Sequence, residues 1–232
     1  MRVSFGTSCM GRLEDIERTY LENISICERF GLECEFVLLN WNSPDDLDIW
    51  VNQNLTPYIS KGLVKYLVNT DAVEFSQSKT KNTTLKNSSG DILCTLDADN
   101  LISDKFLKEL ASSFSCGENN ILQCEGGPMA GRIAFLKKSF LKIRGFDEGM
   151  HGWGWEDRDF VLRFTKFFNT ELKTLSKHCC GRAFFQPEED RTPHEQRMNE
   201  MKINRDISNA NIKQGNFVVN AEEWGMHFSY EK

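Results

Sequence analysis

The sequence contains no run of about 18 uninterrupted apolar residues, so no membrane-spanning helix is expected. Its first residues, MRVSFGTSCM, also lack the basic region, apolar region and cleavage site of a secretory signal. We therefore expect a cytoplasmic protein whose membrane contact, if it has one, is peripheral and on the inner face. The eight cysteines include no CxxC pair, which argues against a structural zinc site at His178-Cys179-Cys180. In that compartment the thiols should be reduced and mostly buried.

The sequence also lacks the signatures of three other binding classes. A formal net charge of −6 disfavours a general nucleic-acid binder. The glycine-rich segment GGPMAGR (126–132) does not have P-loop spacing, so a hinge or a close approach to a ligand is favoured over phosphate cradling. An EF-hand loop starting at Asp97 is excluded, because its glycine and glutamate positions hold Ile102 and Lys108. No repeat or low-complexity linker divides the chain, and we expect one domain over 1–232.

Strand-like and helical segments alternate through the first hundred residues, and the second half is less regular. The expected strands lie within 2–9, 34–46, 62–70, 91–100 and 126–146. The expected helices lie within 12–31, 47–55, 78–90, 104–114, 126–146, 158–168 and 192–214. Strands that alternate with helices indicate an α/β fold whose sheet is largely parallel and covered by helices on both faces.

Polar residues follow three of the expected strands, in GTSC (6–9), NWNS (40–43) and DADN (97–100). Ligands of such sheets bind at the carboxyl ends of the strands. Asp97 and Asp99, two residues apart on one strand, would share a face and repel unless a cation lies between them. Oxygen ligands of this kind suit Mg²⁺ or Mn²⁺ holding a diphosphate. A solvated strand end with helix-capping side chains explains the same residues about equally well.

Two motifs carry a family resemblance. Asp97-Ala98-Asp99 resembles the DxD motif of GT-A glycosyltransferases. Asn82 stands eight residues before Gly90-Asp91, which is similar to the helix and Gly-Asp turn that precede DxD in glycosyltransferase family 2. The segment KKSFLKIRGFDEGMHGWGWEDRD (137–159) resembles, without a gap, the C-terminal motif of the family 7 β-1,4-galactosyltransferases. The resemblance implies a GT-A fold, with a Rossmann-like mixed sheet that binds a nucleotide sugar.

In such a fold, residues 1–100 would form the nucleotide-sugar half, and residues 101–232 the acceptor half with a C-terminal helix. The resemblance implies that Asp99 binds the metal and that Asp97 contacts the metal or the donor ribose. His194 is favoured as a further metal ligand, with His178 as the alternative. Other donor contacts are expected from polar side chains at the strand ends, in the 78–90 helix and beside the glycine-rich segment: Thr7, Ser8, Arg12, Asn40, Asn42, Lys81, Asn82, Asp91 and Arg132.

On the acceptor side, the resemblance implies that Asp157 is the general base and that Glu156 binds acceptor hydroxyls. Trp153 would line the sugar site on a mobile loop, with Trp155 beside it. Other interpretations stay open: Asp157 could cap the following helix, and Glu156 could pair with Arg158 or Arg163.

The chain departs from its relatives at three positions. Trp155 replaces a glycine, which would narrow the acceptor site or stiffen the loop. Arg158 replaces an acidic residue next to the expected base. Asn40 stands where many family 2 members carry an aspartate near the nucleobase, so the nucleobase contact is not defined by the motif.

These observations predict a Mn²⁺- or Mg²⁺-dependent inverting glycosyltransferase. It would transfer galactose, N-acetylgalactosamine or glucose from a UDP-sugar to a saccharide, or lipid-linked saccharide, in bacterial surface glycan synthesis. A nucleotidyltransferase acting on sugar phosphates is one alternative, although the first strand is not followed by the Gly-rich, basic signature of that class. A non-catalytic module that binds a sugar nucleotide or glycan is the other.

Overall fold

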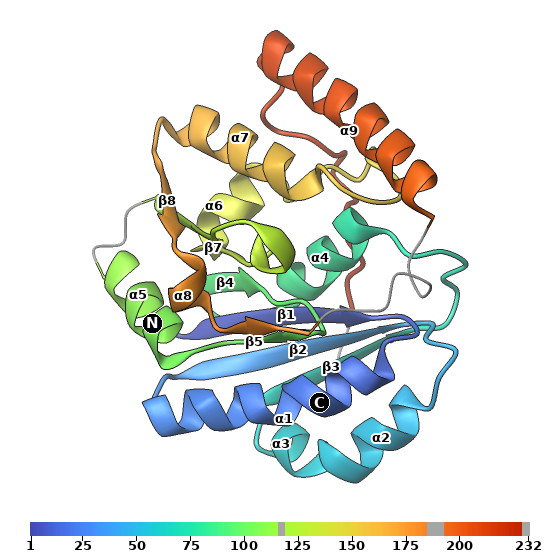
Figure 1. Ribbon diagram of the computed structural model, residues 1–232, viewed down its shortest axis with the longest axis vertical. Coiled ribbons are helices and arrows are strands. Elements are labelled where there is room, and N and C mark those ends of the chain that lie inside the picture. The colour runs from blue at the N-terminus through green and yellow to red at the C-terminus, as the bar shows by residue number, and fades with distance from the viewer. Residues whose placement is uncertain (116–118, 185–192, 229–232) are drawn as a thin grey trace.

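A seven-stranded mixed sheet organises the chain, with strand order β3-β2-β1-β4-β7-β6-β8 (Figure 1). The computed structural model describes residues 1–115, 119–184 and 193–228. The strands are β1 (Val3–Cys9), β2 (Cys34–Trp41), β3 (Val64–Asn69), β4 (Ile92–Thr95), β5 (Asn100–Leu101), β6 (Ile121–Cys124), β7 (Ile133–Leu136), β8 (Leu172–Leu175) and β9 (Arg182–Ala183). The helices are α1 (Leu13–Phe30), α2 (Leu47–Asn54), α3 (Thr56–Ser60), α4 (Gln77–Lys86), α5 (Asp104–Ser113), the 3₁₀ turn η1 (Gly127–Met129), α6 (Lys137–Lys142), α7 (Glu156–Phe168), α8 (Lys177–Cys180) and α9 (His194–Gln214).

The two halves of the sheet are built differently. Strands β1 to β4 pair in parallel, as the alternation of strands and helices predicts. Strand β7 then runs antiparallel to both β4 and β6, and β8 pairs in parallel with β6. A separate two-stranded ribbon joins β5 to β9. The α/β prediction is confirmed, and the sheet is mixed because the second half enters it through the antiparallel strand β7.

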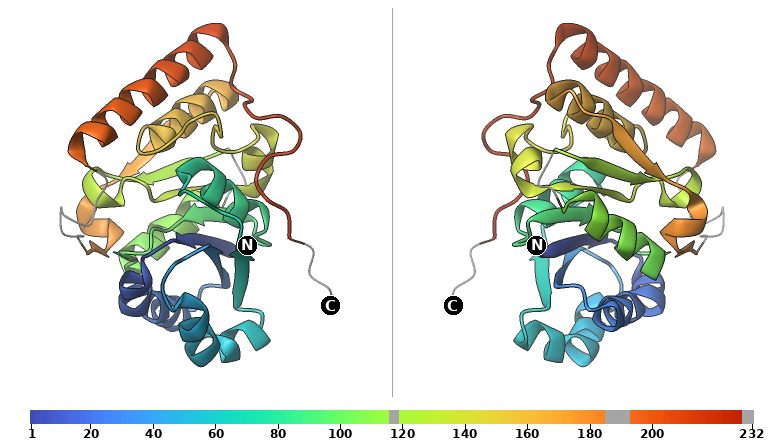
Figure 2. Two further views of the ribbon diagram at one scale, coloured as in Figure 1. Left: turned by 90° about the vertical axis from the view of Figure 1, so that its right-hand side faces the viewer. Right: turned by 90° about the vertical axis from the view of Figure 1, so that its left-hand side faces the viewer.

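Helices cover both faces of the sheet, as Figure 2 shows: α1, α2 and α3 lie on one side, and α4, α7 and α9 on the other. Strand β2 reads as a continuous apolar run because its side chains enter two cores. Phe36 and Leu38 pack toward α1, whereas Val37 and Leu39 pack on the opposite face. No helix in the described part of the chain has the length and apolar character needed to cross a bilayer.

Helix α4 is unusually polar for a buried element, and its packing explains this. Thr80, Thr83 and Thr84 are buried, and their hydroxyls donate back to carbonyl oxygens of the same helix. The helix lies so close to β1 that a Cβ on Gly6 would meet the Thr84 hydroxyl at 2.8 Å. Small side chains on both elements allow this approach, which carries Lys81 to the carboxyl end of the sheet.

Three predicted boundaries are corrected. The expected 78–90 helix ends at Lys86, before a turn that reaches Gly90. The expected 91–100 strand ends at Thr95, so Asp97 and Asp99 lie in the turn between β4 and β5 and do not share a strand face. Helix α7 begins at Glu156 and not at 158, which places both predicted acceptor-side carboxylates in its first turn.

The seven cysteines in the described residues are free, and all except Cys179 are buried. The expectation of mostly buried thiols is confirmed. Their sulfur atoms fill core positions on several elements, among them β1, α1, β2 and β4, and act there as small apolar groups.

Candidate active site

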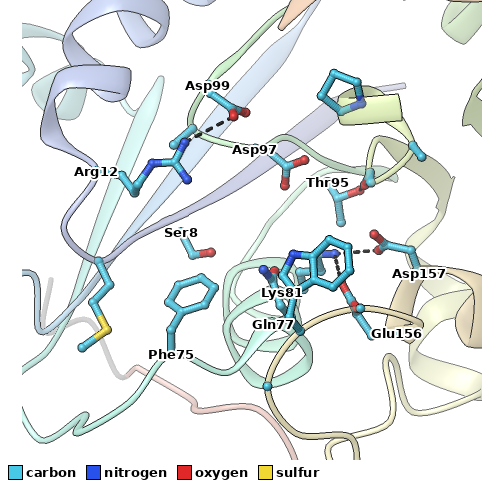
Figure 3. Close-up of a pocket in the computed structure, with 18 of the residues that line it drawn as sticks. Ser8, Arg12, Phe75, Gln77, Lys81, Thr95, Asp97, Asp99, Glu156 and Asp157 are labelled. Carbon is cyan, nitrogen blue, oxygen red and sulfur yellow. Dashed lines mark hydrogen bonds and ion pairs between the residues drawn. The ribbon is translucent and has the colours of Figure 1, made fainter. Parts of the chain in front are cut away.

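A cavity of about 800 Å³ opens at the carboxyl ends of β1 and β4. Its size is within the range of small-molecule sites, and its place in the fold is where α/β sheets bind ligands. Figure 3 shows residues from both halves of the chain pointing into it. The predicted site residues that line the cavity are Ser8, Arg12, Lys81, Asp97, Asp99, Trp153, Trp155, Glu156 and Asp157.

At one side of the cavity, Asp99 is held by two hydrogen bonds. Its Oδ2 accepts from Arg12 Nη2 at 3.2 Å, and its Oδ1 accepts from Asn100 Nδ2 at 2.7 Å. Arg12 also donates through Nε to Asp15 at the start of α1. For Asp97, burial and then the neighbouring Asp99 charge raise the pKa of the carboxyl, although Lys81 opposes the shift. This side of the cavity therefore carries the carboxyl groups of Asp97 and Asp99, together with the Arg12 guanidinium that pairs with Asp99.

At the other side, Lys81 joins the two carboxylates of the first turn of α7 (Figure 3). Its Nζ donates to Glu156 Oε1 at 2.9 Å and to Asp157 Oδ1 at 2.6 Å. Burial and the adjacent Glu156 raise the pKa of Asp157 to about 8, against the attraction of Lys81. Burial disfavours the lysine charge, but Asp157 and Glu156 outweigh it and raise the pKa of the ammonium. A carboxyl with a pKa near neutrality is suited to proton transfer.

Gly131 separates the two acidic walls. A Cβ at this position would lie 2.9 Å from Asp97 Oδ2 and 3.1 Å from Asp157 Oδ2. Both oxygens therefore face the same small space above the Gly131 backbone, and any side chain there would fill it. The geometry leaves room for a reacting group between a carboxylate from the first half and one from the second.

The loop 151–155 forms the outer wall of the cavity, and α9 holds it. Asn204 donates to the carbonyl oxygens of His151 and Gly154 and accepts from His151 N. Glu200 Oε2 accepts from Trp153 N at 2.8 Å. Trp153 keeps 43% of its surface exposed. The loop that was expected to be mobile is thus tied to the C-terminal helix in this structure.

Trp155 has a left-handed backbone, with φ of 76°. A bulky residue rarely adopts this conformation, which costs on the order of 1 kcal/mol. Glycine would adopt this conformation freely. The indole ring lies 4.8 Å from the Arg158 guanidinium, so the departures at positions 155 and 158 contact each other. Because Trp155 is the N-cap of α7, Asp157 does not cap this helix.

Four predicted donor residues do not line the cavity: Thr7, Asn40, Asn42 and Asp91. Thr7 points to the face of β1 opposite Gly6 and Ser8, since strand residues alternate. Asn40 donates to Asp48 of α2, and Asn42 donates to the carbonyl oxygen of residue 72. Asp91 precedes β4 and accepts from Arg2 N, at the opposite end of the strand from the cavity.

Asn82, Arg132 and His194 also lie outside the cavity lining. Asn82 donates to the carbonyl oxygen of Phe146 and accepts from its backbone N–H, and so fixes the turn that precedes the loop 151–155. Arg132 is buried and donates to backbone carbonyls and to Asn100 Oδ1. His194 is exposed at the first residue of α9. The glycine-rich segment containing Arg132 does approach the site, through Gly131.

The sequence did not single out several residues that line the cavity. One group comprises Met10, Phe75 and Gln77, and a second group, from α9, comprises Gln196 and Glu200. A periodicity search misses the first group because it lies in or beside turns. The α9 residues could have been suspected, because a long helix with so few apolar positions needs a reason to be polar.

The described residues contain no cluster of three or more His, Cys, Asp or Glu side chains placed to hold a metal ion. Asp97 and Asp99 nevertheless fit Mg²⁺ or Mn²⁺, because these ions are commonly held by one or two carboxylates together with substrate phosphates. His178 does not line the cavity either. The donor set therefore fits an ion shared with a bound diphosphate.

A family model described as the N-terminal domain of galactosyltransferase matches residues 126–181, which include Gly131 and the first turn of α7. In three dimensions the chain is similar to the mannosyltransferase PcManGT from Pyrobaculum calidifontis, a complex with GDP-Man and Mn²⁺. The TM-score is 0.66 at 16% identity, over 81% of this chain and 58% of that one. The chain has the GT-A glycosyltransferase fold. The resemblance inferred from the DxD and Gly-Trp-Gly motifs is thereby confirmed.

Two further GT-A structures show the same likeness. TarS from S. aureus, in complex with UDP-GlcNAc, gives a TM-score of 0.64 at 15% identity, over 91% of this chain and 67% of that one. Drosophila β1,4-galactosyltransferase 7, in complex with xylobiose, gives a TM-score of 0.62 at 14% identity, over 88% of this chain and 79% of that one. No curated protein matches this chain by sequence. The chain spans 58% of the length of the mannosyltransferase, so its own substrates have to be inferred from the site.

Proposed function

We propose that this protein is a metal-dependent inverting glycosyltransferase that moves a hexose from a UDP-sugar to a saccharide hydroxyl. One observation carries the proposal: Asp97 and Asp157 face the same space above Gly131 from opposite walls of one cavity. Transfer from a nucleotide sugar needs negative groups at both places, one to hold a metal with the diphosphate and one to accept a proton.

The first wall would bind the donor. Asp97 and Asp99 would hold a divalent ion with the diphosphate, and the ion would supply Lewis-acid neutralisation of the leaving group. Arg12, which now pairs with Asp99, is placed to contact a phosphate oxygen once that pair opens. Phe75 and Met10 line the same end of the cavity and offer apolar surface to a nucleobase.

The second wall would bind and activate the acceptor. Asp157 Oδ2 would take the hydroxyl proton, and the hydroxyl oxygen would attack the anomeric carbon as the bond to the diphosphate breaks. In-line attack from the side opposite the leaving group inverts the anomeric centre. Glu156 would accept a hydrogen bond from a neighbouring acceptor hydroxyl, and Trp153 would offer its exposed ring to a sugar face.

Galactose, N-acetylgalactosamine and glucose are our candidate donor sugars. UDP as the nucleotide is supported by the likeness to structures determined with UDP-sugars, although PcManGT was determined with GDP-Man. A sugar-nucleotide-binding module without catalysis would share the donor wall. It would have no need for a carboxyl with a raised pKa at Asp157.

A donor screen by thermal shift tests the proposal. Each UDP-sugar, GDP-mannose and a set of nucleoside triphosphates would be added with and without Mn²⁺. We expect one nucleotide sugar to raise the melting temperature only with the metal, and the triphosphates to have little effect. Stabilisation by triphosphates alone would favour a nucleotidyltransferase, and no response to any nucleotide would refute the proposal.

A matched pair of variants assigns the response to the donor wall. Asp99→Asn removes a predicted metal ligand and should abolish the metal-dependent shift. Asp104→Asn removes the same charge from the exposed first turn of α5, outside the cavity, and should keep it. Equal responses from the two variants would show that the metal binds elsewhere.

A further inference from the structure

Lys81 was expected to contact the donor diphosphate, but its place in the structure points to a different role. It is 8% exposed and comes from α4, in the first half of the chain. Both of its observed ionic partners are in the second half, at the start of α7. A buried ammonium that spans two elements in this way is costly to desolvate unless its partners are fixed.

The backbone that carries Lys81 is fixed by the packing of α4 and by hydrogen bonds of the neighbouring residue. Helix α4 packs on β1 and β2. Asn82, which follows Lys81 in this helix, forms hydrogen bonds with the backbone of Phe146. The Lys81 ammonium lies over the Phe146 ring, with Nζ 5.4 Å from the ring centroid. A movement of the ammonium toward a diphosphate would break its hydrogen bonds to both carboxylates.

The contact also solves an electrostatic problem at the start of α7. Glu156 and Asp157 are adjacent carboxylates in a first turn, where the helix dipole favours negative charge but the two groups repel each other. The Lys81 ammonium lies between them and offsets this repulsion. Without it, the two side chains would be expected to turn apart toward water.

The hydrogen bonds of Lys81 further select one oxygen of Asp157. Oδ1 accepts from Lys81 Nζ at 2.6 Å, whereas Oδ2 faces the space above Gly131. We propose that Lys81 is a positioning residue for the acceptor side: it fixes Glu156 and Asp157 so that Asp157 Oδ2 meets the acceptor hydroxyl, and it takes no part in donor binding. This inference rests on the proposed function.

Three variants test it: Lys81→Met, Lys81→Arg and, as a control, Lys79→Met, which removes an exposed lysine from the same helix. The probe is UDP-galactose, or whichever UDP-sugar the donor screen selects, with Mn²⁺. Donor affinity is measured by calorimetry, and turnover is measured as UDP release with water as acceptor. Misplacing a catalytic group by about 1 Å costs on the order of 100-fold in rate. We expect a loss of that size in kcat for Lys81→Met, with a donor Kd unchanged within about threefold of wild type.

Lys81→Arg should recover most of kcat, because a guanidinium can donate to both carboxylates, and Lys79→Met should behave as wild type. A Lys81→Met variant with full kcat, or one whose donor Kd rises tenfold at unchanged kcat, overturns the inference. If Lys81→Met does not fold, the double variant Lys81→Met/Glu156→Gln removes one of the two carboxylates that lose their partner, and its donor Kd must still match wild type.

The two possible failures are distinguishable. Wild-type protein that neither binds nor consumes any nucleotide sugar refutes the proposed function, and the role of Lys81 falls with it. Active wild-type protein whose Lys81 variants lose donor binding refutes only the positioning role and restores the diphosphate contact expected from the sequence.

Discussion

Replacing Arg12 with glutamine should raise the affinity of the nucleotide-free protein for Mn²⁺. Asp99 already uses both of its oxygens within the protein, Oδ1 with Asn100 and Oδ2 with Arg12. A divalent ion that binds Asp99 must displace the guanidinium from Oδ2, so part of the metal-binding free energy is spent on breaking an ion pair. Removing the guanidinium removes that cost.

The size of the effect follows from the exposure of the pair. The Arg12 and Asp99 side chains are 26% and 20% exposed, so water and salt screen their attraction. Such a pair contributes about 1 kcal/mol, which corresponds to about fivefold in a dissociation constant. With UDP present the effect should reverse, because the Arg12 displaced from Asp99 can then pair with the diphosphate. The Arg12→Gln variant should therefore bind Mn²⁺ and UDP together less tightly than the wild type does.

Electron paramagnetic resonance of free Mn²⁺ during titration measures both affinities. Arg18→Gln is the control: Arg18 also approaches Asp15, at 3.9 Å, and its loss changes the net charge equally without touching Asp99. An unchanged or lower Mn²⁺ affinity in the nucleotide-free Arg12→Gln protein would refute the competition. So would an equal increase in the Arg18→Gln control, because the effect would then be one of overall charge.

Four other outcomes are expected. Asp157→Asn should lower UDP release by about 10² to 10⁴-fold with donor affinity kept, and a fully active variant would show that another group is the base. Wild-type UDP release should rise as the pH passes through about 8, where Asp157 loses its proton, and a flat profile from pH 6 to 9 would contradict this. By linkage, a raised carboxyl pKa also means that the free energy of unfolding falls as the pH rises from about 4 to about 8. Asn204→Ala should cost about 1–3 kcal/mol in a thermal melt because it leaves polar groups of the 151–154 loop unpaired, and an unchanged melting temperature would show that water replaces the amide.

The first half of the fold could be predicted because its signals are local. Ile16, Tyr20 and Ile24 recur at helical spacing in α1, and Gly31 ends the helix with a left-handed backbone. Strands β6 and β8 are four residues each, and neither was predicted from the sequence. They are strands because β7 offers an edge to β6 and β6 in turn offers an edge to β8, and no local pattern contains these long-range pairings.

The acidic residues of the site could be predicted from motifs, but their surroundings could not. The sequence placed Asp97, Asp99, Glu156 and Asp157 as candidates, and all four line one cavity. The partners of Lys81 are 75 and 76 positions away, so nothing near Lys81 distinguishes it from a solvated lysine. The start of α7 was missed because the left-handed backbone of Trp155 sets it, and a tryptophan gives no sign of that conformation.

Lys81 and Asn82 are consecutive residues of α4, yet both complete the second half of the molecule, one at the start of α7 and the other at Phe146. The proposed acceptor side therefore includes residues from the first half of the chain. A chimera joined at residue 100, made to graft a new acceptor specificity onto this donor half, would set two buried polar side chains against surfaces shaped for other partners. Engineering by exchange would have to carry α4 together with residues 101–232, as one inherited unit.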